Sequence, residues 1–106
     1  MTVSHIIPEE VQKAAMYVDT NSHIDNYVLA GNVAENITKP TNGNYVVFSA
    51  DGDFWAAYDH TASTSSTDIT DGTGSELNPV VRDVRHVTTI SVNSTAARKL
   101  SCLWYK

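Results

Sequence analysis

The dipeptide Asp51-Gly52 constrains the fold of this chain more than any other feature. It separates two runs rich in apolar and aromatic residues, "NYVVFSA" at 44–50 and "DFWAAYD" at 53–59. Asp-Gly between such runs is a strong local signal for a β-hairpin, because both central residues of a type I′ turn have positive φ. The sequence therefore predicts that 44–50 and 53–59 pair as adjacent antiparallel strands.

Other parts of the chain also have the period-two pattern of short strands. The run 23–40 alternates in short stretches, is interrupted at Gly31 and ends at Pro40. Near the C-terminus, 86–94 and 98–106 are joined by "TAA" and predict a second hairpin. We expect a mainly β protein of five or six strands, folded as an antiparallel β-sandwich, with a jelly roll among the topologies that this allows.

The length of 106 residues fits a single domain, in which 23–106 forms the sandwich and 1–22 an N-terminal arm or helix. Residues 8–18 begin with Pro and place Val and Ala at helical spacing, which favours a short helix over an extended arm. The apolar side chains of this arm precede a sandwich that the later strands can close by themselves, so we expect them to form an interface. The predicted interface residues are Ile6, Ile7, Val11, Met16 and Tyr17.

Charge and hydropathy exclude several partners. The net charge of −5 provides no basic surface for a phosphate backbone, so we expect no nucleic-acid binding. No apolar run is long enough to span a membrane, and the N-terminus lacks the pattern of a signal peptide, so we expect a soluble protein made in a cytoplasm. The single cysteine, Cys102, lies in the alternating run "LSCLWY" and is expected to be a small buried hydrophobe rather than a reactive thiol.

The stretch "DITDGTGSELNP" at 68–79 is the densest group of acidic and turn-forming residues. Its acids do not have the spacing of an EF-hand loop, whereas Asp71-Gly72 and Asn78-Pro79 are turn dipeptides. We therefore predict structural turns here, with a cation site or a ligand contact as the less favoured alternatives.

No group of residues predicts catalysis or a cofactor. The four histidines show no metal-ligand spacing, although His23 and Asp25 would share one face of a strand. No nucleophile motif is present, so we expect a non-enzymatic protein without metal or cofactor.

The aromatic residues are expected to pack mostly in the core, with a sugar-stacking surface as the alternative. Phe54 and Trp55 are adjacent in a predicted strand and would face opposite sides of its sheet. The full set is Phe48, Phe54, Trp55, Tyr58, Trp104 and Tyr105.

The order of the motifs over 34–106 resembles a group of small structural proteins of tailed bacteriophages. The matching segments are "AENITKPTNGNYVVFSADGDFWAAYD", "DITDGTGSELNP", an arginine (Arg82 or Arg85), "VTTISVNST" and the terminal "WYK". In those proteins an apolar strand closes in Ser-x-x-Gly-Asp-Phe, and a loop close to Asp-x-Thr-Asp-Gly-Thr-x-Ser-Glu-x-Asn-Pro follows.

The resemblance implies a component of the virion head, and we expect a decoration (cement) protein that binds the capsid surface and bridges capsomers. Its expected partners are the major capsid protein and further copies of itself, as a dimer or trimer. Two alternatives remain open: a tail or head–tail joining protein, and a carbohydrate-binding module that uses Trp55 or Tyr58.

Overall fold

The computed structural model describes residues 23–106, which form eight β-strands in two sheets. The strands are β1 (His23–Leu29), β2 (Glu35–Ile37), β3 (Tyr45–Ala50), β4 (Trp55–Tyr58), β5 (Glu76–Leu77), β6 (Val81–Asp83), β7 (Ile90–Asn93) and β8 (Arg98–Tyr105). The helix predicted over 8–18 lies outside the described residues. So do all five predicted interface residues, Ile6, Ile7, Val11, Met16 and Tyr17.

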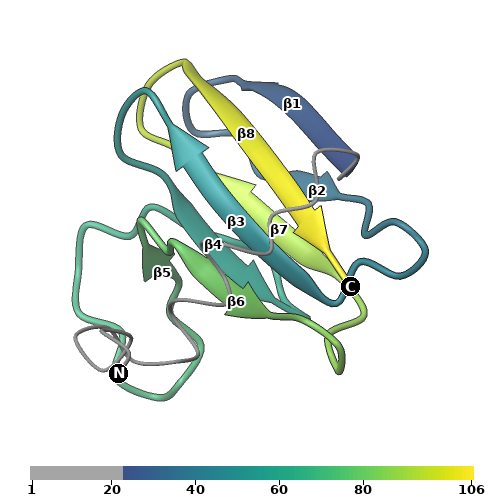
Figure 1. Ribbon diagram of the computed structural model, residues 1–106. Coiled ribbons are helices and arrows are strands. Elements are labelled where there is room, and N and C mark those ends of the chain that lie inside the picture. The colour runs from purple at the N-terminus through teal and green to yellow at the C-terminus, as the bar shows by residue number, and fades with distance from the viewer. Residues whose placement is uncertain (1–22) are drawn as a thin grey trace, which may run out of the picture.

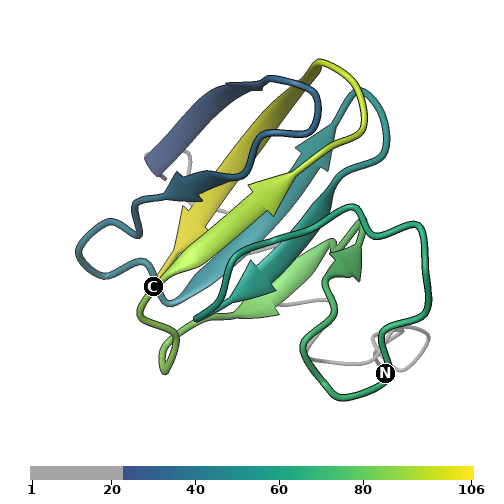
Figure 2. The same cartoon turned by 180° about the vertical axis from the view of Figure 1, so that it is seen from behind.

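Each sheet has four strands, and every pair of neighbouring strands is antiparallel. The order is β1-β8-β3-β6 in one sheet, which faces the viewer in Figure 1 and is called the front sheet. The order is β2-β7-β4-β5 in the other, called the back sheet, which comes forward in Figure 2. The fold is therefore the predicted antiparallel β-sandwich, with eight strands rather than five or six.

The pairing follows a simple rule. The last four strands pair with the first four in reverse order, β1 with β8, β2 with β7, β3 with β6 and β4 with β5. This is one long antiparallel ribbon that is folded over, so that β8 also pairs with β3 and β7 with β4. The result is an eight-stranded jelly roll.

The core lies between the two sheets and follows the predicted alternation. β8 turns Leu100, Cys102 and Trp104 inward, and none of the three is more than 2% exposed. The ring of Phe48 in β3 meets the ring of Phe54, which directly precedes β4, with centroids 5.6 Å apart. Burial of Cys102 is as predicted, and it raises the pKa of the thiol to about 12.

The predicted hairpin at Asp51-Gly52 is wrong. β3 belongs to the front sheet and β4 to the back sheet, so residues 51–54 carry the chain from one sheet to the other. Asp51 stays with the front sheet, where its carboxylate accepts the backbone N–H of Lys99 at 3.0 Å. Gly52 does not have positive φ. An Asp-Gly dipeptide makes a reversal easy, but burial of both inner faces decides which sheet the next strand joins.

Gly52→Ala is expected to change the free energy of unfolding by less than about 1 kcal/mol. A Cβ at Gly52 would clash with the Arg98 side chain near Nε, and this flexible side chain can move into solvent. Within residues 23–106 the Arg98 Nε is buried without a hydrogen-bond partner, so movement of the side chain into solvent would also hydrate this atom. Thermal unfolding followed by circular dichroism measures the change.

Gly31→Ala is the matched control for this prediction. A Cβ at Gly31 would meet backbone atoms, Cα of Ala96 at 3.1 Å and the carbonyl oxygen of Thr95 at 3.2 Å. Backbone cannot swing away as the Arg98 side chain can, so Gly31→Ala should destabilise the protein more than Gly52→Ala. The reverse order would show that the Gly52 site is the more rigid of the two.

The second predicted hairpin is also wrong, because β7 lies in the back sheet and β8 in the front sheet. Ser94 begins the crossing and is fully buried, with its hydroxyl donating to the carbonyl oxygen of Ala96 at 2.7 Å. Its own carbonyl oxygen accepts the N–H of Asn32 at 2.6 Å. These bonds hold the β7–β8 connection against the β1–β2 connection. No local sequence pattern predicts this contact.

β7 alternates weakly because both of its faces are buried. Ile90 and Val92 belong to the core, whereas Ser91 and Asn93 face outward and are covered by the segment that follows β4. Within that segment, Ala62 donates its N–H to the Ser91 hydroxyl at 2.9 Å and accepts from the Asn93 amide at 3.2 Å. The polar residues of β7 therefore anchor a loop rather than face solvent.

Candidate functional site

The outer face of the front sheet carries a continuous apolar row. The cross-strand register places Ile24 beside Leu103, Leu103 beside Val47, and Val47 beside Val81, so one outward-facing apolar residue comes from each strand. Ile24 is 57% exposed and Val81 39% exposed, while the two central residues are half-buried. We call these four residues the apolar row.

Aromatic residues border the apolar row on one side. Tyr45 and Tyr105 are paired across β3 and β8, and both are half-buried. The Arg85 guanidinium lies 5.4 Å from the ring centroid of Tyr45. Arg85 also donates to both carboxylate oxygens of Asp83 at 2.9 and 3.0 Å, and this pairing lowers the pKa of Asp83 to about 2. The charges at this border are therefore paired with each other.

Small polar side chains border the row on the other side. Asn26, Ser101 and Ser49 are aligned across β1, β8 and β3 by the same register. Because these side chains are short, an open hollow of about 510 Å³ lies over this part of the sheet. Lys99 and Asp51 line its far end.

This arrangement suits contact with another protein surface. An apolar strip flanked by tyrosines, short polar groups and self-paired charges has the composition of an interface core and its rim. Sequence reasoning missed this surface, because its residues come from four strands whose register no local pattern provides.

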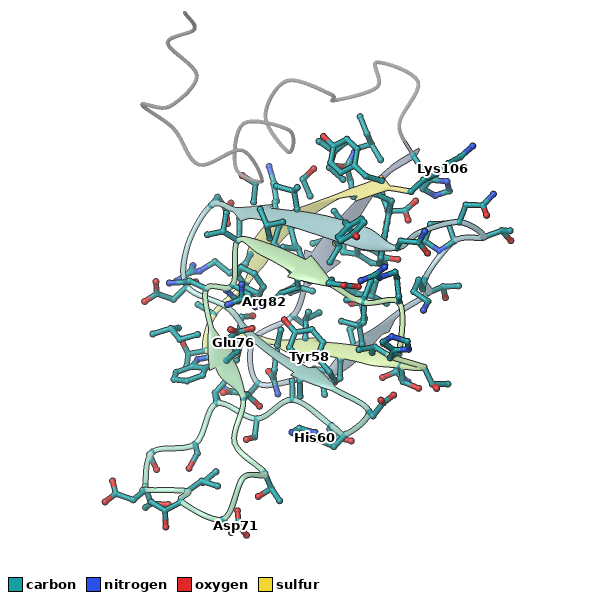
Figure 3. All side chains as sticks on the ribbon, turned by 60° about the horizontal axis from the view of Figure 1, so that its bottom comes forward. Tyr58, His60, Asp71, Glu76, Arg82 and Lys106 are labelled. Carbon is teal, nitrogen blue, oxygen red and sulfur yellow. The ribbon has the colours of Figure 1, made fainter. Side chains whose placement is uncertain are left out.

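A second cluster joins the two sheets at one end of the sandwich. Tyr58 in β4 donates its hydroxyl proton to Oε1 of Glu76 in β5 at 2.8 Å. Arg82 in β6 donates through Nε to both carboxylate oxygens of Glu76 at 3.0 Å, and through Nη2 to Oε2. Figure 3 shows the three side chains pointing toward one another. Tyr58 and Glu76 belong to the back sheet and Arg82 to the front sheet, so the cluster links the sheets.

The hydrogen bonds of this cluster favour an ionised Glu76 and a protonated Tyr58. Hydrogen bonds from Arg82 are the main cause that lowers the pKa of Glu76, so the carboxylate stays ionised. Burial, followed by the bond to Glu76, raises the pKa of Tyr58, so the phenol keeps its proton. A carboxylate held by these donors suits a structural link better than proton transfer.

The acidic stretch 68–79 contains one local turn and one long-range contact. Asp71 accepts the Thr73 N–H at 3.1 Å and the Thr73 hydroxyl at 2.6 Å, and Gly72 has φ of 90°, so the turn predicted here is confirmed. Asn78-Pro79 is the second predicted turn dipeptide, and the Asn78 side chain makes no bond to nearby backbone. Its side chain instead accepts the Phe54 N–H at 3.0 Å and donates to Asp53 at 2.9 Å.

Chelation by EDTA is expected to leave the melting temperature unchanged. Over residues 23–106 no three His, Cys, Asp or Glu side chains are grouped to hold a metal ion. In Figure 3, Asp71 lies at the tip of its loop, away from Glu76. A structural cation would couple binding to folding, so a drop of several degrees in EDTA, reversed by added Ca²⁺, would contradict the turn interpretation.

The prediction that His23 and Asp25 share one face of a strand is confirmed. Nε2 of His23 lies 2.9 Å from Oδ1 of Asp25, and Oδ2 of Asp25 accepts the Trp104 indole N–H at 3.1 Å. The pair therefore anchors β1 to β8. His60 has its ring nitrogens 3.1 Å and 3.0 Å from the carbonyl oxygens of Tyr58 and Gly74, which places it on the loop rather than in a ligand group.

The predicted aromatic candidates separate into two groups. Phe48, Phe54 and Trp104 are core residues, whereas Trp55 is half-buried. Trp55 is opposite Leu77, which is 47% exposed, on the outer side of the back sheet. Tyr58 packs against the core, so it does not present its ring to solvent as a stacking surface.

Comparison of the chain with protein-family models, curated proteins and solved structures gives no match. Within residues 23–106 there is no helix long and apolar enough to cross a membrane.

Proposed function

We propose that this protein is a decoration protein of a tailed-bacteriophage head, which binds the outside of the capsid and bridges neighbouring capsomers. Its partner is the major capsid protein, and its place is the capsid surface after synthesis in the host cytoplasm. The observation that carries the proposal is the apolar row on the outer face of the front sheet. A rigid sandwich that presents such a surface can bind a flat protein shell without catalytic groups.

The motifs that resemble phage structural proteins form one structural unit, which supports the proposal. Asn78 of the acidic stretch bonds Asp53 and Phe54 of the Ser-x-x-Gly-Asp-Phe motif through its side chain. The Asn78 N–H also donates to the Phe54 carbonyl oxygen at 2.9 Å. Two motifs separated in sequence are therefore joined by hydrogen bonds in the fold.

Binding to undecorated capsids tests the proposal. The full-length chain should bind capsids, and Val47→Lys, at the centre of the apolar row, should weaken binding at least about 10-fold because it places a charge in an apolar contact. Asn36→Lys is the control, since Asn36 is exposed on β2 of the back sheet, away from the apolar row. Equal loss in both variants, or no binding of the parent chain, would contradict the proposal.

The N-terminal segment provides a second part of the same test. We propose that Ile6, Ile7, Val11, Met16 and Tyr17 contribute to attachment. Deletion of 1–18 should leave the sandwich folded, because every described strand lies within 23–105, and should weaken capsid binding at least about 100-fold. Glu9→Ala is the control within the segment. Unfolding of the truncated chain would mean that the segment belongs to the core.

Cryo-electron microscopy of the virion distinguishes the head from the tail. Density for this chain over the whole shell supports a decoration protein, whereas density at the tail vertex alone supports the joining-protein alternative. The carbohydrate-binding alternative depends on Trp55, beside Leu77 on the back sheet. If Trp55→Ala and the parent chain give the same signals on a glycan array, the carbohydrate-binding alternative is excluded.

A further inference from the structure

The free edge of β1 differs from the other three sheet edges. β6 and β2 have three residues and β5 has two, whereas β1 has seven. Short edge strands protect a sheet against pairing with other chains, as do Lys, Pro and bulges. β1 contains neither Lys nor Pro, and within residues 23–106 it pairs only with β8. Among the described residues, its second edge is therefore unpaired and carries a long row of backbone donors and acceptors.

The outward-facing residues of β1 are arranged symmetrically about Asn26, with one apolar residue on each side. Ile24 is 57% exposed and Val28 is 75% exposed, and they lie at equal distances in sequence on either side of Asn26, which is also exposed. If two copies of β1 pair antiparallel about a two-fold axis at Asn26, Ile24 of each copy is opposite Val28 of the other. Apolar pairs directly opposite each other stabilise a sheet, so the exposed residues of this strand complement themselves.

The charges of β1 are compatible with this pairing. Asp25 is the only acidic residue of the strand, and in the two-fold register it is opposite Tyr27 of the second copy rather than another carboxylate. Its two oxygens are already engaged with His23 and with Trp104 of β8, which directs the carboxylate toward its own sheet. Two chains of net charge −5 can thus meet along this edge without directly opposed like charges.

We propose that β1 is a homodimer interface, in which two copies pair antiparallel about Asn26 and join their front sheets into one continuous sheet. The apolar rows of the two copies then lie on the same face, with Val28 of each copy adding to the surface at the junction. The inference stands on the edge geometry and does not depend on the proposed capsid function.

Sedimentation velocity over a concentration series tests the interface with the full-length chain. The parent chain should dimerise. Ile24→Lys with Val28→Lys places like charges opposite each other twice and should raise the dissociation constant at least about 100-fold. Val81→Lys, on β6 at the opposite edge of the same sheet, is the control and should leave the dimer intact. Thermal unfolding checks that each variant folds.

A charge-swap variant tests the register itself. Ile24→Lys with Val28→Glu brings opposite charges together in the two-fold register, so this variant should dimerise again and should dissociate on addition of salt. A parent chain that is monomeric at every concentration, or trimeric, would overturn the proposal. So would a charge-swap variant that is as monomeric as the double Lys variant.

Cross-linking locates the two-fold axis. Opposed residues of antiparallel strands have Cα atoms about 4.5–5.5 Å apart, within the range that a disulfide spans. Asn26→Cys should therefore form a disulfide-linked dimer on mild oxidation, whereas Val81→Cys should not. The native Cys102 does not interfere, because it is fully buried. Equal cross-linking of the two variants would place the contact elsewhere.

Discussion

Replacing Trp104 with Ala is expected to lower the melting temperature by at least about 12 °C, or to unfold the protein at room temperature. Trp104 is 2% exposed and faces inward from β8, the strand that pairs with both β1 and β3. Removal of a buried Trp side chain costs about 3–5 kcal/mol, a large part of the stability of a domain of this size. The loss should also weaken the contact between β1 and β8, because Asp25 would lose its bond to the indole N–H.

Trp104→Phe separates the volume of the side chain from its hydrogen bond. Phe keeps an aromatic ring in the core and lacks the N–H, so the expected cost is about 1–3 kcal/mol. Asp25→Asn removes the charge but keeps an acceptor for the indole, and it should cost less than Trp104→Ala. Far-UV circular dichroism during thermal unfolding measures all three. A Trp104→Ala variant that melts within a few degrees of the parent chain would contradict the assignment of Trp104 to the core.

Alternation in the sequence predicts which side chains of a strand face the core. The inward set of β8, Leu100, Cys102 and Trp104, follows directly from period two, and the sandwich class follows from strands with polar connections. Alternation does not indicate which strands pair with each other. Asp51-Gly52 and the connection before β8 both suggested hairpins, yet both cross between the sheets. In a jelly roll most sequential strands alternate between sheets, so local turn signals mislead there.

The candidate site could not be predicted from the sequence either, because local patterns do not indicate which strands are neighbours. Ile24, Val47, Val81 and Leu103 are ordinary outward positions of four strands, and only the register of β1-β8-β3-β6 aligns them into a row. Asn78 is a second case, because a residue typical of local turns bonds Phe54, 24 positions away. Conversely, the Asp71-Gly72 turn was predictable, since its side-chain bonds reach only two residues along the chain.

Raising the pH above about 9 is expected to lower the free energy of unfolding progressively. Burial raises the pKa of Cys102 from its ordinary 9.0 to about 12. Burial is also the largest cause of the raised pKa of Tyr58, to which the bond to Glu76 adds. The same direction holds, with burial as the main cause, for Tyr27 and Tyr105.

The sign of the effect follows from these directions. Each group has a higher pKa in the folded protein than in the unfolded chain, so its contribution to stability is fully present below the unfolded pKa. As pH rises from about 9, the unfolded chain releases these protons while the folded protein retains them, and unfolding is favoured. The Cys102 difference alone corresponds to up to about 4 kcal/mol by the time pH reaches the folded pKa of about 12.

Urea unfolding at a series of pH values from 7 to 11 measures this loss, and Cys102→Ala identifies its source. Ala cannot ionise, so the variant should lose less stability between pH 9 and 11 than the parent chain, even though the smaller side chain makes it somewhat less stable at pH 7. Ser101→Ala is the control, because Ser101 is a non-ionisable, outward-facing residue of the same strand, so its loss of stability with pH should equal that of the parent chain. If the two variants lose stability in parallel with the parent chain, Cys102 is not the group that resists ionisation. If the stability of the parent chain is constant up to pH 11, water must reach the inner face of β8. The assignment of Cys102 and Trp104 to a closed core would then be wrong.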